Sequence, residues 1–368
     1  MTDLENKPPA SPEAEPPAAG ETPAPQSPPP EEGGPSRKRL ALVAVLALAL
    51  AMPLYVLAKH LILGHRAAAS APQVVVEIPR GAGALQVGEI LAQAGVVRQA
   101  WLFALATRLG QQPGRLQAGE YGLSAAMTLR DILEMLEQGR VLQHLVLIPE
   151  GFTLAQILER LVQERLLAPG EAQALPGDHQ LAASLGLGRE GLEGYLFPDT
   201  YHFPKGLPAK AMLGAMVKRF QQAWEPLAPA AQAQGLSRRQ AVTLASIIER
   251  EAKVPAERPL ISAVYHNRLK KGMKLQADPT VIYGLPDFDG AITRAQLEHD
   301  HPYNTYTREG LPPGPICSPG RASLAAAVHP AAVDYLYFVA KGDGSHAFSV
   351  EYRDQINNVN KLRQLQGR

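Results

Sequence analysis

Two glutamates, Glu249 and Glu251, stand at the end of an apolar segment, where a carboxyl group can become an acid catalyst. Residues 241–248 read Ala-Val-Thr-Leu-Ala-Ser-Ile-Ile, which is apolar nearly all round and is typical of a helix buried on most sides. Burial penalises the charged carboxylate, so it raises the pKa of the acid toward the range in which a proton can be donated near pH 7. The segment therefore predicts a proton-transferring carboxyl group.

The spacing of the two glutamates argues against a facing pair. Residues two positions apart on an α-helix are separated by about 200° of rotation, so one glutamate should face a cleft and the other a structural partner. Arg250 and Arg258 are available as partners, and a simple ion pair at a helix end explains either glutamate without catalysis. The spacing alone does not choose between Glu249 and Glu251.

The helix that carries these glutamates has a clear start. Ser237 and Gln240 fit the capping box, in which a serine at the N-cap and a glutamine three residues later satisfy each other's backbone N–H groups. We therefore expect the candidate acid on a well-defined buried helix.

Downstream, residues 311–315 read Leu-Pro-Pro-Gly-Pro, a composition that indicates a rigid cleft wall rather than a ligand.

Upstream, a β-rich run followed by Ile-Pro-x-Gly and a helical pattern occurs twice, at residues 74–81 and 145–151. Between them, Thr128 is a plausible N-cap for a helix beginning near Leu129. Short βα elements of this kind resemble LysM, a module that commonly holds glycan chains, and predict such a module over residues 70–165. The alternative is a spacer with ordinary packing helices. Residues 166–368 then form the catalytic domain, and the fold class is α+β.

Residues 193–201 gather three aromatic residues around a Pro-Asp pair. Aromatic rings stack on the C–H faces of sugars, while a neighbouring carboxylate accepts hydrogen bonds from sugar hydroxyls. Aromatic packing at a domain junction would produce the same pattern.

Composition excludes several classes of function. The 368 residues include 36 Lys and Arg against 35 Asp and Glu, which argues against a nucleic-acid partner. Cys317 is the single cysteine, so neither an intrachain disulfide nor a cysteine-based zinc cluster can form, and no metal site is predicted. No histidine and acid pattern near Cys317 marks it as a nucleophile.

The N-terminus predicts a tail and a membrane anchor. Residues 1–36 hold eleven prolines and seven acidic residues, a composition typical of a disordered segment. Residues 40–57 carry no charge and as a helix would span about 27 Å, close to the hydrocarbon core of a bilayer. We assign 37–63 to the basic flank and anchor. The alternative is a cleaved signal peptide ending at 69–71, but the apolar run is longer than a signal sequence requires. The basic run 37–39 favours a cytoplasmic tail.

Several ordered motifs resemble the YceG-like family of endolytic murein transglycosylases, from about residue 74 to the C-terminus. The motifs are Ala-Ser-Ile-Ile-Glu-Arg-Glu-Ala at 245–252, Asn-Arg-Leu at 267–269, Leu-Gln-Ala-Asp-Pro-Thr-Val-Ile-Tyr-Gly at 275–284, Tyr-Asn-Thr-Tyr at 303–306, Gly-Leu-Pro-Pro-Gly-Pro-Ile at 310–316 and Ser-Pro-Gly at 318–320. In the family's Glu-x-Glu motif the second glutamate is catalytic, and it falls on Glu251. The resemblance, rather than the helix geometry, selects Glu251 over Glu249.

The resemblance implies a lyase that cuts the β-1,4 bond between N-acetylmuramic acid and N-acetylglucosamine in nascent glycan strands. The products would carry 1,6-anhydro ends, no cofactor or metal would be needed, and strand elongation would be limited. The expected partners are peptidoglycan strands, the membrane and peptidoglycan synthases. The expected place is the bacterial inner membrane, crossed once, with a cytoplasmic N-terminus and a periplasmic catalytic domain.

Four further residues are candidates for binding the substrate. Gln276, Asp278, Asn304 and Tyr306 could hydrogen-bond the N-acetyl and hydroxyl groups of the sugar. Their alternative role is turn chemistry, because Asp-Pro and Asn are both at home in loops. A different class of function is a non-catalytic wall-binding or division scaffold whose LysM-like module does the work, although such a protein would have little reason to keep an acid in a buried helix.

Overall fold

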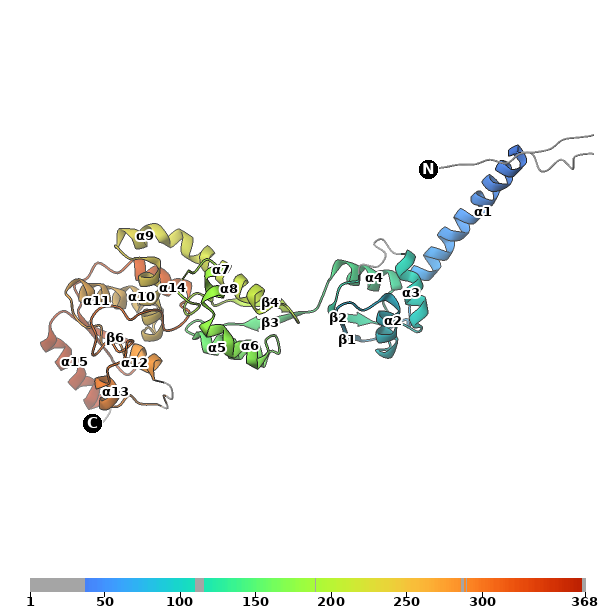
Figure 1. The fold of residues 1–368 in the computed structure, drawn as a ribbon. Helices are drawn as coiled ribbons and strands as arrows, with labels where there is room; N and C mark the ends of the chain where they lie inside the picture. Colours follow the sequence, from blue (N-terminus) through green and yellow to red (C-terminus); the bar gives the residue numbers. More distant parts are fainter. Residues whose placement is uncertain (1–36, 110–115, 189, 286–287, 289, 366–368) are drawn as a thin grey trace, which may run out of the picture. The chain divides into compact units, whose positions relative to one another are not determined.

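The computed structural model describes residues 37–365, except for 110–115, 189, 286–287 and 289 (Figure 1). The predicted tail at 1–36 lies outside these residues. The chain divides into two compact units, Met1–His60 and Leu61–Arg368. The described part of the first unit is α1 (Arg37–Leu63), whose last three residues belong to the second unit.

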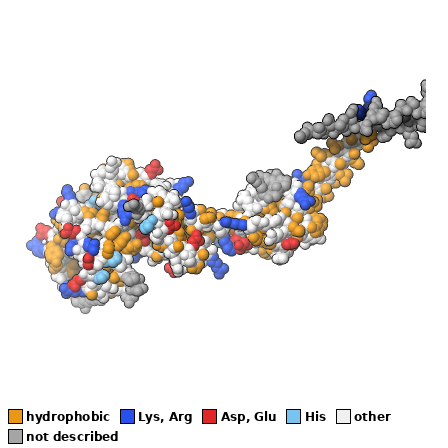
Figure 2. Space-filling view, in the orientation of Figure 1, with side chains coloured by type: hydrophobic (Ala, Val, Ile, Leu, Met, Phe, Trp, Pro, Cys, Tyr) orange, Lys and Arg blue, Asp and Glu red, His pale blue; other side chains and the backbone are white. Residues whose placement is uncertain are grey.

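Helix α1 has the length and composition of a membrane span. An 18-residue window in it reaches a mean hydropathy of 2.6, and none of that window is buried. Figure 2 shows its surface as almost continuously hydrophobic. Pro53 lies inside the helix. Membrane helices tolerate an internal proline because neighbouring groups satisfy the backbone hydrogen bonds that it breaks. Membrane anchors and signal sequences share these properties, so α1 is a candidate anchor.

The second unit begins with a small core around a two-stranded sheet. Strand β1 (Gln73–Ile78) pairs antiparallel with β2 (Gly119–Ser124), with Val76 opposite Tyr121. Helices α2 (Ala84–Gln93), α3 (Ala100–Leu109) and α4 (Leu129–Gln138) complete this core. Thr128 caps α4 in a reciprocal capping box with Asp131, which confirms the N-cap that the sequence predicts.

A larger core follows, built around β3 and the helices after it. Strand β3 (Gln143–Leu147) pairs antiparallel with β4 (Thr200–Pro204), and α5 (Leu154–Gln163) packs into the same core. Residues 143–165, which the sequence pattern assigns to the LysM-like module, therefore contribute to the second core. The partner of β3 lies more than fifty residues further along the chain, and a strand pattern does not identify a distant partner.

The other elements of the second core are mostly helical, and the whole is a mixed α+β arrangement, as the sequence predicts. They are α6 (Pro169–Ala174), α7 (His179–Ser184), α8 (Ala209–Trp224), α9 (Ala228–Ala233), α10 (Arg238–Glu251), α11 (Arg258–Lys270), α12 (Asp278–Gly284), α13 (Arg294–Glu298), α14 (Arg321–Val328), β5 (Tyr337–Ala340), β6 (His346–Ser349) and α15 (Tyr352–Leu365).

Helix α10 lies at the centre of this core. Ser237 and Gln240 form the capping box that the sequence predicts, and all eight residues from 241 to 248 are buried. Helices α11, α12 and α14 pack around it (Figure 1). The helix is therefore apolar nearly all round because it is covered nearly all round, and only its end carries acids.

The turn at Gly194 gives a test of the second core. Gly194 has φ +84°, and a Cβ there would overlap the ring of Pro315, whereas Gly206 has φ +77° and open space around it. We expect Gly206→Ala to cost about 1 kcal/mol through backbone strain alone, and Gly194→Ala to cost about 2–4 kcal/mol through strain plus overpacking. Urea unfolding followed by the fluorescence of the buried Trp224 measures both. Equal costs would contradict the packing at Pro315.

Candidate active site

Glu251 is the last residue of α10; the residue is partly exposed, but its carboxyl group is largely removed from water beside Tyr265 of α11. The hydroxyl of Tyr265, a buried residue of α11, donates a hydrogen bond to its Oε1 at 3.2 Å. Burial, and then the charge of Asp278, raise the pKa of Glu251 to about 7, while the Tyr265 hydrogen bond and the charge of Arg268 act in the opposite direction. Such a group exchanges a proton readily near neutral pH.

Arg268 of α11 is a buried cation near this acid. Its Nε donates to the carbonyl of Leu336 at 2.7 Å, and its Nη1 donates to the carbonyl of Leu275 at 2.8 Å. The guanidinium carbon lies 5.4 Å from the centre of the Tyr337 ring. The sequence includes Arg268 in the Asn-Arg-Leu motif but predicts no role for it, and it does not single out Tyr265. Nothing in the local pattern shows that α11 packs beside the end of α10.

Glu249 faces a different environment. Its side chain is 7% exposed, Arg258 Nη2 donates to its Oε1 at 3.3 Å, and the backbone N–H of Gly320 donates to its Oε2 at 2.9 Å. Arg258 is held in turn by a hydrogen bond from its Nε to Ser323 Oγ at 3.0 Å. The two glutamates therefore face different surroundings, as the helical spacing predicts, and Glu249 has Arg258 as its structural partner.

Three of the four candidate substrate residues lie together. Tyr306 donates a hydrogen bond from its hydroxyl to Oδ1 of Asp278, the first residue of α12. Gln276 is exposed and has φ +50°, and its backbone N–H donates to the carbonyl of Thr305 at 3.1 Å. Thr305 Oγ1 also accepts from the backbone N–H of Ala277 at 3.0 Å. Segments 276–278 and 305–306 thus form one bonded platform.

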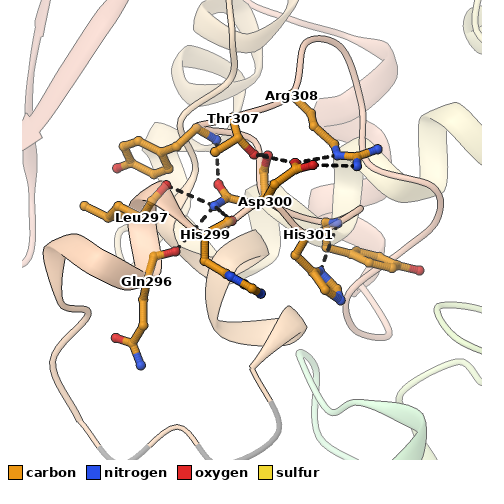
Figure 3. A network of polar contacts seen from close by, with 10 residues as sticks. Gln296, Leu297, His299, Asp300, His301, Thr307 and Arg308 are labelled. Atoms are coloured by element: carbon orange, nitrogen blue, oxygen red, sulfur yellow. Dashed lines mark hydrogen bonds and ion pairs between the residues drawn. The ribbon is translucent and has the colours of Figure 1, made fainter.

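Asn304, the fourth candidate, is used inside its own loop. It is 1% exposed, and its Nδ2 donates to the carbonyls of Gln296, Leu297 and His299, the last at 2.7 Å (Figure 3). Its Oδ1 accepts from the backbone N–H of Tyr306 at 2.8 Å. These bonds match the alternative of turn chemistry, and they leave a direct substrate role for Asn304 without support.

The same loop is closed by a charged pair. Arg308 donates from Nε to Asp300 Oδ1 at 2.9 Å and from Nη2 to Asp300 Oδ2 at 3.0 Å, and the hydroxyl of Thr307 donates to Oδ1 of the same carboxylate (Figure 3). The bidentate geometry fixes both ends of the loop around Asn304. The loop that carries Tyr306 is therefore held together by paired polar groups although it is neither helical nor extended.

Glu193, beside the start of α5, is a second acid with a raised pKa. Glu193 accepts hydrogen bonds from the backbone N–H of Leu154, at 3.1 Å to each carboxylate oxygen, and from the hydroxyl of Tyr283 at 3.1 Å. Burial raises the pKa of Glu193 to about 7 against the effect of these bonds. The carboxyl group thereby connects the start of α5 to α12.

The aromatic residues that follow Glu193 do not form a sugar platform. Tyr195, Phe197 and Tyr201 are all buried, and Tyr195 packs edge-on against Phe220 of α8 with ring centres 5.0 Å apart. Ring faces enclosed in a core cannot stack on a glycan. The sugar-binding interpretation of this cluster is wrong and the packing alternative is right, because the local sequence does not show which side of the turn is covered.

Two hollows share the proline-rich segment as a wall. One, of about 590 Å³, is lined by Lys274, Pro302, Thr307, Arg308, Glu309, Leu311 and Pro313. The other, of about 390 Å³, is lined by Leu236, Arg239, Gln240, Thr243, Leu269 and residues 310–313. Lys274 stands two residues before Gln276, so the larger hollow borders the platform. The segment 311–313 is a wall, as its composition indicates.

Comparison with known proteins identifies relatives over most of the chain. The model of the YceG-like family matches residues 76–361. The endolytic murein transglycosylase of Bacillus subtilis is 33% identical over 292 residues, covering 75% of this chain and 81% of that protein. The endolytic murein transglycosylase of Streptococcus pneumoniae serotype 2 is 30% identical over 319 residues, and the match spans 78% of this chain and 58% of that longer protein.

A solved structure agrees with these matches. The crystal structure of a YceG-like protein from Listeria monocytogenes is 34% identical, with a TM-score of 0.54, and the match covers 78% of this chain and 99% of that one. The family match runs from β1 into α15, so it includes both cores and the segments that surround Glu251.

The pairing of Glu249 predicts a stability effect. Glu249→Gln leaves Arg258, whose side chain is 13% exposed, without this counter-charge, so we expect a loss of about 1–3 kcal/mol in the free energy of unfolding. Glu298→Gln is the matched control, because its partner Arg294 and the glutamate itself are both exposed and such pairs contribute little. Urea unfolding of both variants measures the change in the free energy of unfolding. A Glu249→Gln protein as stable as the control would contradict the structural role.

The raised pKa of Glu251 predicts a stability that depends on pH. In the unfolded chain this carboxyl has its ordinary pKa of 4.5, and in the fold about 7, so its ionisation destabilises the fold progressively as pH rises through that interval. We expect Glu251→Gln to be more stable than the parent by up to about 3 kcal/mol at pH 8 and by much less at pH 4.5. Glu193 titrates in both proteins and cancels. A stability difference independent of pH would contradict the burial of Glu251.

Proposed function

The chain belongs to the YceG-like family, and from this premise we propose that it is an endolytic peptidoglycan lytic transglycosylase with Glu251 as the proton-transferring residue. The observation that carries the proposal is the carboxyl group of a partly exposed residue at the end of a buried helix, with a pKa that burial raises to about 7. The relatives named endolytic murein transglycosylases support the same activity.

The proposed reaction needs one carboxyl group in two protonation states. Protonated Glu251 donates to the oxygen of the β-1,4 bond between N-acetylmuramic acid and N-acetylglucosamine, and the bond from C1 to that oxygen breaks. The carboxylate of Glu251 then takes the proton of the muramoyl C6 hydroxyl while O6 bonds to C1, which yields a 1,6-anhydro end. A pKa near 7 suits both steps, because the group must give and accept a proton at the same pH.

Intramolecular attack explains why a second catalytic carboxylate is not required. Glycoside hydrolases use a pair, one member of which activates water or forms a covalent intermediate. Here the C6 hydroxyl is already attached to the reacting sugar, so its effective concentration is high. Glu249 is unsuited to the catalytic role because Arg258 and Gly320 occupy its two oxygens.

The platform beside Glu251 is the proposed sugar-binding surface. Gln276 is a residue other than glycine in the left-handed region, and such backbone conformations cluster at functional sites. We assign its exposed amide to contacts with the N-acetyl group, and the polar groups of Asp278 and Tyr306 to the neighbouring hydroxyls. Asn304 then acts by positioning Tyr306.

The remaining parts fit an enzyme that works on strands as they are made. We assign α1 to a single span of the bacterial inner membrane, with the N-terminus cytoplasmic and the rest periplasmic, where peptidoglycan synthases are the expected partners. The order β1, α2, α3, β2 supports a LysM-like module that holds the glycan. Cuts inside nascent strands would limit their elongation.

The test is a digestion of un-crosslinked glycan strands by the full-length protein in detergent, with products analysed by mass. We expect 1,6-anhydro ends from the parent, a loss of at least about a hundredfold in rate for Glu251→Gln, and near-parent activity per folded molecule for Glu249→Gln.

Other outcomes of this digestion each have a clear meaning. Ordinary reducing ends would indicate a hydrolase. No cleavage by the parent would favour a wall-binding scaffold. Near-normal activity of Glu251→Gln would overturn the assignment of the acid.

A further inference from the structure

Glu251 is surrounded by charged and titratable groups that oppose one another. From α11, the Tyr265 hydroxyl donates to its carboxylate and the Arg268 guanidinium supplies positive charge. From α12, Asp278 supplies negative charge, and Tyr306 lies close by on the loop after α13. Tyr265 and Arg268 favour the ionised form of Glu251, whereas Asp278 disfavours it. Burial is the largest influence against ionisation of Glu251, and the negative charge of Asp278 adds to it.

The fold holds the Asp278 carboxylate through a chain of contacts. The Tyr306 hydroxyl donates to its Oδ1, and the backbone N–H of Tyr306 donates to Asn304 Oδ1 at 2.8 Å. Asn304 is in turn anchored to three carbonyl groups of its loop. On the other side, Thr305 binds the backbone N–H groups of Gln276 and Ala277, which lead directly into Asp278. The carboxylate is thus fixed from both its own segment and the facing loop.

The hydrogen-bond partner of Asp278 is uncharged. Tyr306 is a neutral donor, so it orients the Asp278 carboxylate without cancelling its negative charge. Glu249 is the contrast within the same helix region, because Arg258 neutralises it. Asp278 is exposed at the first turn of α12, and its negative charge acts on the buried carboxyl group of Glu251, where a charge is screened less than in water.

We propose that Asp278, held by the Tyr306 hydroxyl, is a positioning residue that controls when Glu251 carries its proton. The inference rests on the proposed role of Glu251 as the acid and assigns Asp278 and Tyr306 a function beyond contact with the sugar. Before bond cleavage, repulsion from Asp278 adds to the effect of burial and favours the protonated Glu251 that can donate. After donation, the same repulsion makes the Glu251 carboxylate a stronger base toward the C6 hydroxyl. Tyr265 and Arg268 limit the effect so that the proton can leave.

The first experiment is the pH dependence of strand cleavage by the full-length protein. In kcat/KM, the high-pH limb reports the loss of the protonated acid in the free enzyme. We expect Asp278→Asn to move this limb to lower pH by on the order of one unit, and Asp278→Glu to return most of the shift. Tyr265→Phe should move the limb in the opposite direction. Asp334→Asn, which removes an exposed carboxylate outside the site, should leave it in place.

A second readout does not depend on turnover. The pH dependence of the stability difference between the parent and Glu251→Gln reports the titration of Glu251, and the same difference is measured between Asp278→Asn and the Asp278→Asn, Glu251→Gln double variant. We expect the titration to shift to lower pH in the Asp278→Asn pair. An unmoved titration, or an unmoved limb in an active Asp278→Asn protein, would overturn the proposal.

These outcomes separate the inference from the proposed function. If Glu251→Gln remained active, the assignment of the acid would fail, yet the linked titration would still measure the coupling between Asp278 and Glu251. If Glu251→Gln is inactive and the titration does not respond to Asp278→Asn, the acid stands and the role of Asp278 falls.

Discussion

Removal of the Glu251 carboxyl group from water is the constraint around which the second core is arranged. Eight consecutive residues of α10 are buried before it, and α11, α12 and α14 close around the helix. A carboxylate in such a place is costly unless it is paired or protonated. The fold accepts this cost at Glu251, as it does at Glu193, and removes it at Glu249, where Arg258 supplies a counter-charge.

The difference between the two glutamates comes from the donors that each one meets. Glu249 receives a cation and a backbone N–H group, which favour a permanent charge. Glu251 receives a neutral hydroxyl from Tyr265 and a more distant cation, and it also meets the negative charge of Asp278. Two residues of the same type on the same turn of helix therefore have different chemistry, decided by neighbours from other elements.

Rigid irregular segments complete the site. The loop around Asn304 has neither helix nor strand, yet its carbonyl groups are bound by the Asn304 amide and its ends are joined by Asp300 and Arg308. Backbone polar groups that are paired in this way hold a loop as firmly as regular structure does. Tyr306 and the left-handed Gln276 are consequently held by hydrogen bonds to their neighbours in the loop and the facing segment.

The sequence by itself determined the features that depend on neighbouring residues. The buried character of α10, its capping box at Ser237, the cap at Thr128 and the opposite orientation of Glu249 and Glu251 all follow from periodicity and local hydrogen bonds. The length and apolarity of α1 follow in the same way. The motifs around Glu251 were sufficient to identify the family.

Only the tertiary structure decided which residues meet across the chain. Tyr265 reaches Glu251 from fourteen residues away, Gly320 reaches Glu249 from seventy-one, and Leu154 reaches Glu193 from thirty-nine. Tertiary packing likewise decided that β3 pairs with β4 and that Tyr195 is buried. It also decided that Asn304 bonds to carbonyl groups of its own loop. Local patterns specify which face of an element is apolar, but the partner that covers that face is selected by packing of the whole core.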